Sequence, residues 1–170
     1  VIGTSTEIGA LTIGSAQNGA ITLNGAIITD GAVTIDGPVT LATGAVSVTT
    51  ANDAITFSHS IDGGQTLALA SGSAATALQG EIGGNTALTT LTVNAAGAGT
   101  IEITNIGGVT GATAIGNTNT ATLTLDGTAY STAGTQTYTA KAGANIDITN
   151  ASGVTFTTSN DNIIFATSGV

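Results

Sequence analysis

The sequence predicts an all-β protein, with a parallel β-solenoid favoured over a β-sandwich. Three observations predict it: short aliphatic triplets of alternating polarity, glycine-containing corners between them, and a run in which these units recur every six or seven residues. The chain has 170 residues, few enough for one domain, and we expect a single elongated module.

Most of the predicted strands are triplets that read aliphatic, polar, aliphatic. Alternate side chains of a strand point to opposite faces, so both aliphatic residues would face a core and the middle residue, usually Thr, would face outward. Many of the aliphatic residues are β-branched, which favours strand. The triplets are residues 11–13, 21–23, 33–35, 39–41, 46–48, 55–57, 67–69, 91–93, 101–103, 123–125, 146–148, 154–156 and 163–165.

The spacing between residues 21 and 48 favours a solenoid. The chain there runs ITLNGA, IITDGA, VTIDGP, VTLATGA and VSV. Asn-Gly or Asp-Gly between strands usually indicates a hairpin, but hairpins with strands of about four residues bury little apolar surface. If each unit is instead one strand and one corner, three units make a coil, and stacked coils bury continuous columns of Ile and Val. Pro38 suits a corner, where no ladder donor is needed.

A longer repeat predicts two approximate repeats within the module, residues 1–80 and 81–170. Residues 2–23 align with 82–103 without gaps, with identities such as Leu11/Leu91 and Ile21/Ile101. Residues 33–37 match 123–127, and residues 50–57 match 158–165, at progressively larger offsets that predict insertions in the second copy. The stretch 66–80 is rich in Ala and Leu, and we expect that it could hold a short helical turn.

Composition excludes several classes of function. Aromatic residues are only 3% of the chain, so the core must consist of Val, Ile, Leu and Ala. The net charge is −9 and Lys141 is the sole basic residue, so we expect no binding to nucleic acid or to anionic membrane surfaces. Without cysteine there is neither a disulfide nor a thiolate metal site. Every apolar run is too short to span a membrane, and no signal peptide is visible.

One cluster has the residue types of a hydrolytic triad. Ser58, His59 and Ser60 lie near Asp53 and Asp62. Neighbours on one strand alternate between faces, however, and the chain has no Gly-x-Ser-x-Gly elbow to present a nucleophile. We therefore predict that the protein is not an enzyme and has no catalytic residues.

A structural calcium ion is the one cofactor that the sequence brings into consideration. Asn52, Asp53, Asp62, Asn160 and Asp161 place oxygen ligands beside corners, and hard cations prefer such ligands. Neither the glycine-rich nonapeptide of calcium-binding β-rolls nor the EF-hand spacing is present. Ordinary Asx turns account for the same residues, so we predict no cofactor and no metal site.

The sole lysine suggests an internal crosslink. Lys141 could form an isopeptide bond with Asn145, with Asp147 as the catalytic carboxylate. That reaction needs a buried apolar surrounding, whereas the sequence Ala-Lys-Ala-Gly-Ala is typical of a solvated corner. A solvated lysine is therefore the favoured interpretation.

Two further features admit alternative interpretations. Tyr130 and Tyr138 flank a predicted turn, and they could form a small exposed binding patch or cap one edge of the core. Asn150-Ala-Ser152 matches the N-glycosylation sequon, which is used only in a eukaryotic secretory pathway.

Three stretches resemble units of large repetitive bacterial surface proteins. They are ANDAITFSHSIDGGQTLAL (51–69), GEIGGNTALTTLTVNAAG (80–97) and STAGTQTYTA (131–140). The chain is similar over most of its length to filamentous-haemagglutinin-like and autotransporter-like adhesins, which are often β-solenoids. The resemblance implies secretion, surface display and a role in adhesion, biofilm or filament formation. It carries over no catalytic or binding residue.

Together these observations predict a structural or adhesive module of an extracellular or cell-surface protein, from a bacterium. We expect it to self-associate into fibres or to form part of a stalk, with exposed Thr and Asn free for surface or glycan contacts. One alternative is a pilin-like β-sandwich that polymerises by donor-strand complementation, which the wider strand spacing after Ile55 favours. The other is a carbohydrate-binding module, which the scarcity of aromatic residues disfavours.

Overall fold

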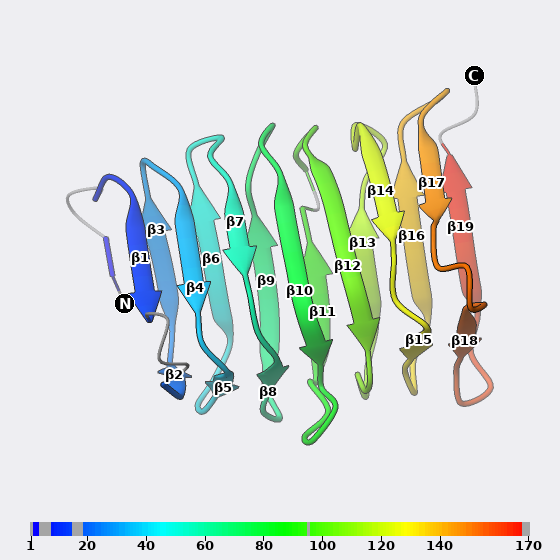
Figure 1. Cartoon of the computed structure of the whole chain (residues 1–170), viewed down its shortest axis with the longest axis horizontal. Helices are drawn as coiled ribbons and strands as arrows, with labels where there is room; N and C mark the ends of the chain where they lie inside the picture. Colours follow the sequence, from blue (N-terminus) through cyan, green and yellow to red (C-terminus); the bar gives the residue numbers. More distant parts are fainter. Residues whose placement is uncertain (1, 4–7, 15–18, 95, 168–170) are drawn as a thin grey trace.

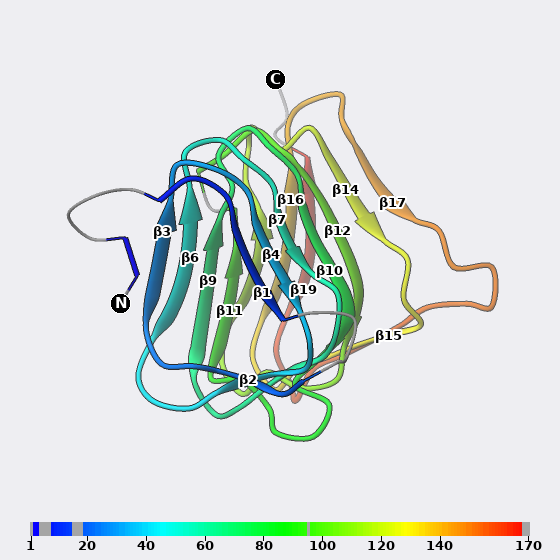
Figure 2. The same ribbon diagram turned by 60° about the vertical axis from the view of Figure 1, so that its left-hand side comes forward.

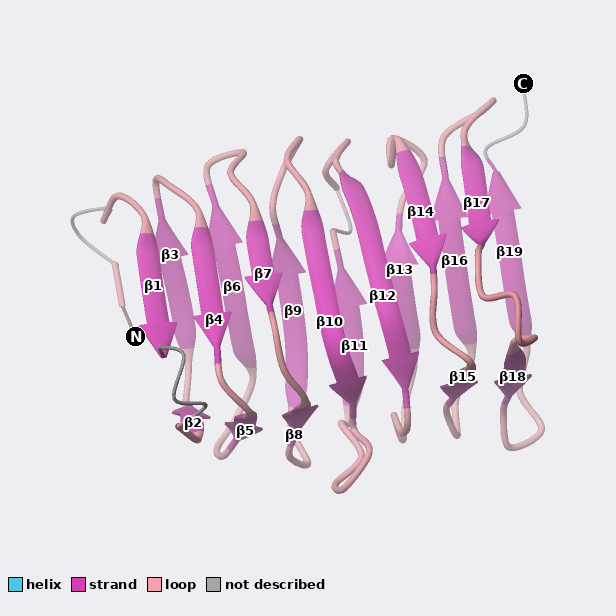
Figure 3. Ribbon diagram, viewed as in Figure 1, coloured by secondary structure: helices cyan, strands magenta, loops and turns pink. Residues whose placement is uncertain are grey.

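The computed structural model describes residues 2–3, 8–14, 19–94 and 96–167, and these form a parallel β-solenoid. Every strand pairing is parallel, and the chain winds through successive coils that stack along the long axis of the molecule (Figure 1). The described residues contain strands, turns and loops but no helix (Figure 3). The favoured prediction is thus confirmed, and the β-sandwich alternative is wrong because its strands would pair antiparallel.

Two sheets face each other across the core (Figure 2). One sheet has seven strands, one from each coil, so the stack completes about six turns between its first and last strand. Its strands are β3 (Ala26–Thr29), β6 (Val46–Thr50), β9 (Thr66–Ala70), β11 (Thr90–Val93), β13 (Thr113–Gly116), β16 (Gln136–Ala140) and β19 (Ile163–Thr167).

The other sheet has twelve strands. Seven of them form its main path: β1 (Leu11–Gly14), β4 (Val33–Asp36), β7 (Ile55–Phe57), β10 (Thr76–Ile82), β12 (Thr100–Ile106), β14 (Thr122–Leu125) and β17 (Asn145–Ile148). The remaining strands are short and follow a bend in the coil: β2 (Ile21–Leu23), β5 (Val39–Leu41), β8 (Ile61–Asp62), β15 (Ala129–Ser131) and β18 (Thr155–Thr157).

The register places like residues in columns that run through the whole stack. One core column of the twelve-stranded sheet contains Ile13, Ile35, Phe57, Leu78, Ile103, Leu125 and Ile148. The column that ends at Phe165 in the seven-stranded sheet contains Ile27, Val48, Leu69, Val93, Ile115, Tyr138 and Phe165. Members of the middle coils are almost fully buried, and each aliphatic side chain buried in this way contributes about 1.5–3 kcal/mol. A thin core therefore stabilises a long stack.

The predicted three-unit coil is confirmed at the start of the stack. Ile21 pairs with Val39, three units further along the chain, and Thr22 and Leu23 pair in the same register. Pro38 lies in the corner before β5, and its carbonyl accepts a hydrogen bond from the backbone N–H of Ile21 (2.8 Å). Later coils are longer, and the extra residues enlarge the corners. The main pairings keep their register, except that β10 and β12 shift register between Leu78 and Glu81.

Two expectations from the longer pattern fare differently. The helical turn expected within 66–80 is wrong, because that stretch forms β9, a turn and the start of β10. The division at residues 80 and 81 falls inside β10, and the aligned pair Leu11 and Leu91 lies in different sheets. Val33 and Leu123, by contrast, lie in one column four coils apart. The division into two repeats, 1–80 and 81–170, stays a prediction. The repeat that the strand pairings show is the single coil.

Candidate interaction surfaces

The triad residue types do not assemble into a catalytic arrangement. Ser58, His59 and Ser60 connect β7 to β8, and His59 Nδ1 lies 3.5 Å from Asp36 Oδ1 without hydrogen-bond geometry. Asp53 precedes β7 and its backbone binds Thr50 Oγ1, so β7 separates it from His59. The structure thus brings an aspartate that the sequence did not single out next to the histidine.

Three of the five residues considered for calcium have a side-chain oxygen that accepts a hydrogen bond. Asp62 Oδ1 accepts from the backbone N–H groups of Asn85 (2.8 Å) and Thr86 (3.1 Å) in the next coil. Asp161 Oδ1 accepts from the hydroxyl of Thr135 (2.7 Å), and Asn52 Oδ1 accepts from the backbone N–H of Ser73 (3.1 Å). Over the described ranges, no group of three or more His, Asp or Glu side chains could hold a metal ion.

Two of these side chains, Asn52 and Asp62, belong to a series of links between successive coils. We call this series the corner ladder, and it consists of Asn52, Asp62, Asn105, Asn117 and Asn150. Each hydrogen-bonds a backbone group of a neighbouring coil, at sequence separations of 20 to 24 residues. A short amide or carboxylate can satisfy corner N–H and C=O groups that have no partner in the sheets.

Asn105 and Asn117 show how the corner ladder works. Asn105 Oδ1 accepts from the N–H groups of Thr128 (2.9 Å) and Ala129 (3.0 Å), and Asn117 Nδ2 donates to two carbonyl groups of the preceding coil (2.6 Å each). Sequence reasoning missed both residues. The only available signal was their place between triplets, which many Asn residues share.

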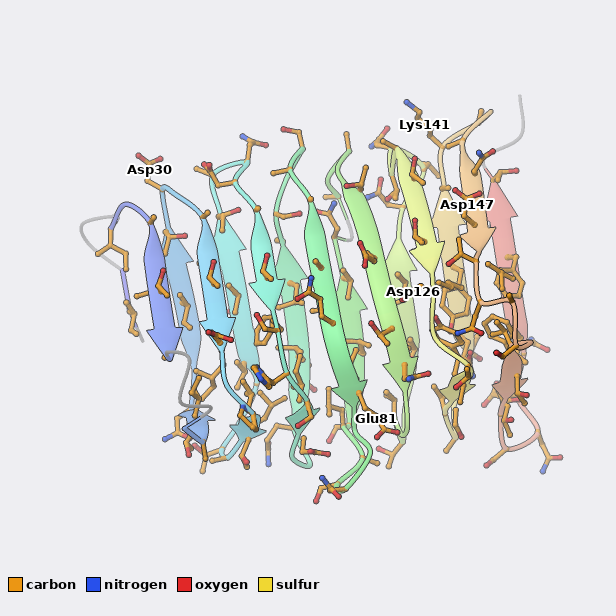
Figure 4. The ribbon with its side chains drawn as sticks, in the orientation of Figure 1. Asp30, Glu81, Asp126, Lys141 and Asp147 are labelled. Atoms are coloured by element: carbon orange, nitrogen blue, oxygen red, sulfur yellow. The ribbon has the colours of Figure 1, made fainter. Side chains whose placement is uncertain are left out.

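Lys141 lies in the corner after β16, and its side chain is exposed (Figure 4). Asn145, the proposed crosslink partner, is also exposed, and its strand β17 lies at the end of the stack. The solvated corner predicted for Lys141 is confirmed. The sequon residue Asn150 donates through Nδ2 to the carbonyl of Asp126 (2.9 Å), so its amide nitrogen is engaged in the corner ladder.

The two tyrosines are core residues, so the prediction of an exposed patch is wrong and the alternative, packing at an edge of the core, is confirmed. Tyr130 and Tyr138 are fully buried, with ring centroids 6.2 Å apart in an edge-to-face arrangement. Tyr130 donates to the carbonyl of Ile103 (2.8 Å), and Tyr138 donates to Gln136 Oε1 (2.8 Å). Burial raises the pKa of Tyr130 to about 12, and burial also raises the pKa of Tyr138 above its ordinary value.

The two ends of the stack are apolar. The large hydrophobic side chains that are exposed among the described residues all lie at the first turn or in the last coil: Ile2, Ile148, Ile163, Ile164 and Phe165. Ile148 is 49% exposed although it continues a core column whose next member, Leu125, is fully buried. Strands β17, β18 and β19 each have a paired neighbour on one side only. We call the exposed side of these three strands, which carries Ile148 and Phe165, the C-terminal end face.

A hollow of about 360 Å³ opens beside the corners that follow β6, β9 and β11. Its polar lining includes Asn52, Ser73 and Asn94, and the remaining lining residues are Thr, Ala and Gly. Asn94 Nδ2 donates to the carbonyl of Gly72 (3.2 Å), while Asn94 Oδ1 is buried without a partner. The hollow is thus lined by amide and hydroxyl groups and by small side chains, with no charged residue among its lining.

The described residues include no helix long and apolar enough to cross a membrane. The fold and these surfaces place the chain in the class of parallel β-solenoid proteins. No protein-family model, curated protein or solved structure matches the chain. The resemblance to haemagglutinin-like adhesins therefore stays a prediction.

Proposed function

We propose that this chain is a structural module of an extracellular filament or stalk, and that its C-terminal end face takes up a further coil. The observation that carries the proposal is that both core columns end in exposed side chains, Ile148 and Phe165. A further coil of matching composition would continue both core columns and the backbone hydrogen bonding of both sheets. The first coil of a second copy offers such a composition.

The coil stack is suited to a mechanical role. Its backbone hydrogen bonds run along the long axis from coil to coil, and the corner ladder adds side-chain links in the same direction. Pulling along the axis would therefore load the several hydrogen bonds between two neighbouring coils together, because they lie side by side, and buried aliphatic columns support each such interface. The scarcity of charged residues, 6% of the chain, leaves these ladders as the main source of rigidity.

End-to-end addition is favoured by the chemistry of the C-terminal end face. Covering half-exposed Ile and Phe side chains contributes about 1 kcal/mol each, because full burial contributes about 1.5–3 kcal/mol. The unpaired edge of β19 would gain a parallel partner at the same time. The proposal also includes surface display and adhesion, which the resemblance to bacterial adhesins supports. It includes weak glycan contacts, which the abundance of Thr and Asn supports. A separate carbohydrate-binding function stays a prediction.

A charge placed on the C-terminal end face tests the proposal. We expect Ile148→Asp to prevent concentration-dependent elongation, measured by light scattering and sedimentation velocity. The matched control is Thr122→Asp, which adds the same charge to the outer side of the same sheet one coil earlier, opposite the uncharged residues Thr100 and Asn145. Elongation should survive in T122D. Equal elongation in both variants, or a wild-type chain that stays monomeric at every concentration, would contradict the proposal.

A further inference from the structure

The corner between β2 and β3 contains an asparagine followed by a glycine, Asn24-Gly25, and Asn24 is exposed. Glycine is common in tight corners because it has no side chain. The same lack of a side chain leaves the backbone N–H of Gly25 open to the side-chain carbonyl carbon of Asn24. The sequence has one other Asn-Gly step, at residues 18 and 19, and Asn18 lies outside the described residues.

The amide of Asn24 is free, unlike the amides of the corner ladder. Within the described part of the chain, the side chain of Asn24 forms no hydrogen bond. Asn105 and Asn117, by contrast, each make two hydrogen bonds to the backbone of a neighbouring coil. Rotation of the Asn24 side chain towards the following backbone nitrogen therefore breaks no bond to the described residues.

The backbone N–H of Gly25 is also without a hydrogen-bond partner among the described residues. Two other glycines that follow an acidic residue differ in this respect. The N–H of Gly63 donates to the carbonyl of Thr86 (3.2 Å), and the N–H of Gly127 donates to Tyr130 Oη (3.0 Å). The chain thus contains corners in which the glycine nitrogen is engaged and one, at Gly25, in which it is free to react.

The corner has room to change its shape. A hollow of about 120 Å³ lies against it, and its lining includes Asn24, Gly25 and Ala26. The flanking side chains of Leu23 and Ile27 are buried in the core, so the strands on both sides hold the ends of the corner in place. Closing a ring within the corner therefore leaves the core columns intact.

We propose that Asn24 is a site of spontaneous covalent modification, in which water converts its amide to a carboxylate. The nitrogen of Gly25 attacks Cγ of Asn24, the new N–Cγ bond closes a five-membered imide, and the Cγ–Nδ2 bond breaks. Ammonia leaves and takes up the proton lost by the Gly25 nitrogen. Water then opens the imide at either carbonyl, which gives aspartate or a β-linked isoaspartate. No oxidant or reductant takes part, and the holding of both groups in one corner favours the reaction.

The product alters the first coil. Each conversion adds one negative charge to a chain of net charge −9. The β-linked product also adds one backbone atom between β2 and β3. The nearest link to the next coil is the hydrogen bond from the N–H of Ala42 to the carbonyl of Leu23 (3.1 Å), so the Ala42 amide should exchange faster with solvent after conversion. The modification does not depend on elongation, so it stands apart from the proposed function.

A second Asn-Gly step built into an engaged corner tests the proposal. Asp62→Asn creates such a step before Gly63, whose N–H is engaged, and keeps an oxygen that can accept from Asn85 and Thr86. The folded D62N chain is incubated in mildly alkaline buffer, and peptide mapping follows the gain of about 1 Da at each site. We expect residue 24 to convert at least tenfold faster than residue 62. In guanidinium chloride, where the chain is unfolded, both should convert at similar rates.

The control for the attacking nitrogen is Gly25→Ala, whose methyl group hinders the attack and should slow conversion of Asn24 at least tenfold. Circular dichroism shows whether each variant is folded. Equal conversion at residues 24 and 62 in the folded D62N chain would overturn the proposal. So would a folded wild-type chain in which Asn24 converts at least tenfold more slowly than in guanidinium chloride.

Discussion

The ring of Phe165 stacks on the ring of Tyr138, with centroids 5.1 Å apart and an angle of 14° between their planes. Tyr138 is fully buried and Phe165 is 44% exposed, although they are neighbours in one core column. Phe156 stacks in the same way on Tyr130 at 5.0 Å. The last coil thus covers the core of the coil before it, and its own apolar residues are left facing outward.

This relationship predicts a gradient of stability along the stack. Phe57→Ala should lower the free energy of unfolding by about 3–5 kcal/mol, because Phe57 is 1% exposed in a middle coil. Phe165→Ala should cost at least 1 kcal/mol less, because solvent already reaches that side chain. Urea unfolding followed by circular dichroism measures both. Equal losses in the two variants would show that the last coil is as well packed as the middle ones.

The corner ladder predicts a specific role for the side-chain oxygen of Asn105. Asn105→Ala should lower the unfolding free energy by about 1–3 kcal/mol, because two backbone N–H groups lose their acceptor. Hydrogen exchange of the Thr128 and Ala129 amides should accelerate in the same variant. Asn105→Asp keeps an oxygen acceptor but places a second carboxylate beside Glu81, so it should restore the exchange protection and only part of the stability. Unchanged exchange in N105A would mean that the corner does not depend on this link.

Close contact between coils predicts that some glycines cannot be replaced. A Cβ atom on Gly127 would collide with the backbone carbonyl of Thr104 in the preceding coil. Gly127→Ala should therefore destabilise the fold by more than about 2 kcal/mol, because backbone must move to accept it. Gly64→Ala is the control, since open space surrounds that position. Thermal unfolding of the two variants, with G64A close to wild type and G127A clearly lower, would bear this out.

Burial of the tyrosines predicts a loss of stability at alkaline pH. The pKa of Tyr130 rises from 10.0 to about 12 in the folded chain, and the pKa of Tyr138 rises as well. The folded state therefore holds these protons more tightly than the unfolded state. Their stabilising effect is complete below pH 10 and is lost as the pH rises from 10 through about 12. Absorbance at 295 nm should show little tyrosinate until unfolding begins, and titration near pH 10 in the folded chain would contradict the burial.

Much of the fold could be predicted because strand periodicity and coil repetition are both local patterns. The triplets identified most strands, and the hexads identified the coil, since Ile21 and Val39 pair at the predicted interval. The strand β10 was missed because its Ala- and Leu-rich sequence has no β-branched triplet. Local composition indicated a helix there, but the neighbouring strands β7 and β12 impose an extended backbone.

The interaction surfaces were harder to predict because they depend on register. Asn105 and Asn117 are ordinary corner residues in the sequence, and only the stacking of the coils places their amides against backbone groups of a neighbouring coil. The burial of Tyr130 and Tyr138 likewise depends on the last coil, in which Phe156 and Phe165 cover them. His59 and Asp36 approach each other because β4 and β7 are adjacent, which no spacing along the chain indicates.

Fibre diffraction of the purified chain, combined with negative-stain microscopy, tests the central claim most directly. If coils of one copy continue the stack of another, filaments should form and give a strong meridional reflection near 4.8 Å along their axis, the spacing between paired strands. Isolated particles under all conditions, or filaments that show only a repeat of several nanometres without that reflection, would contradict the account.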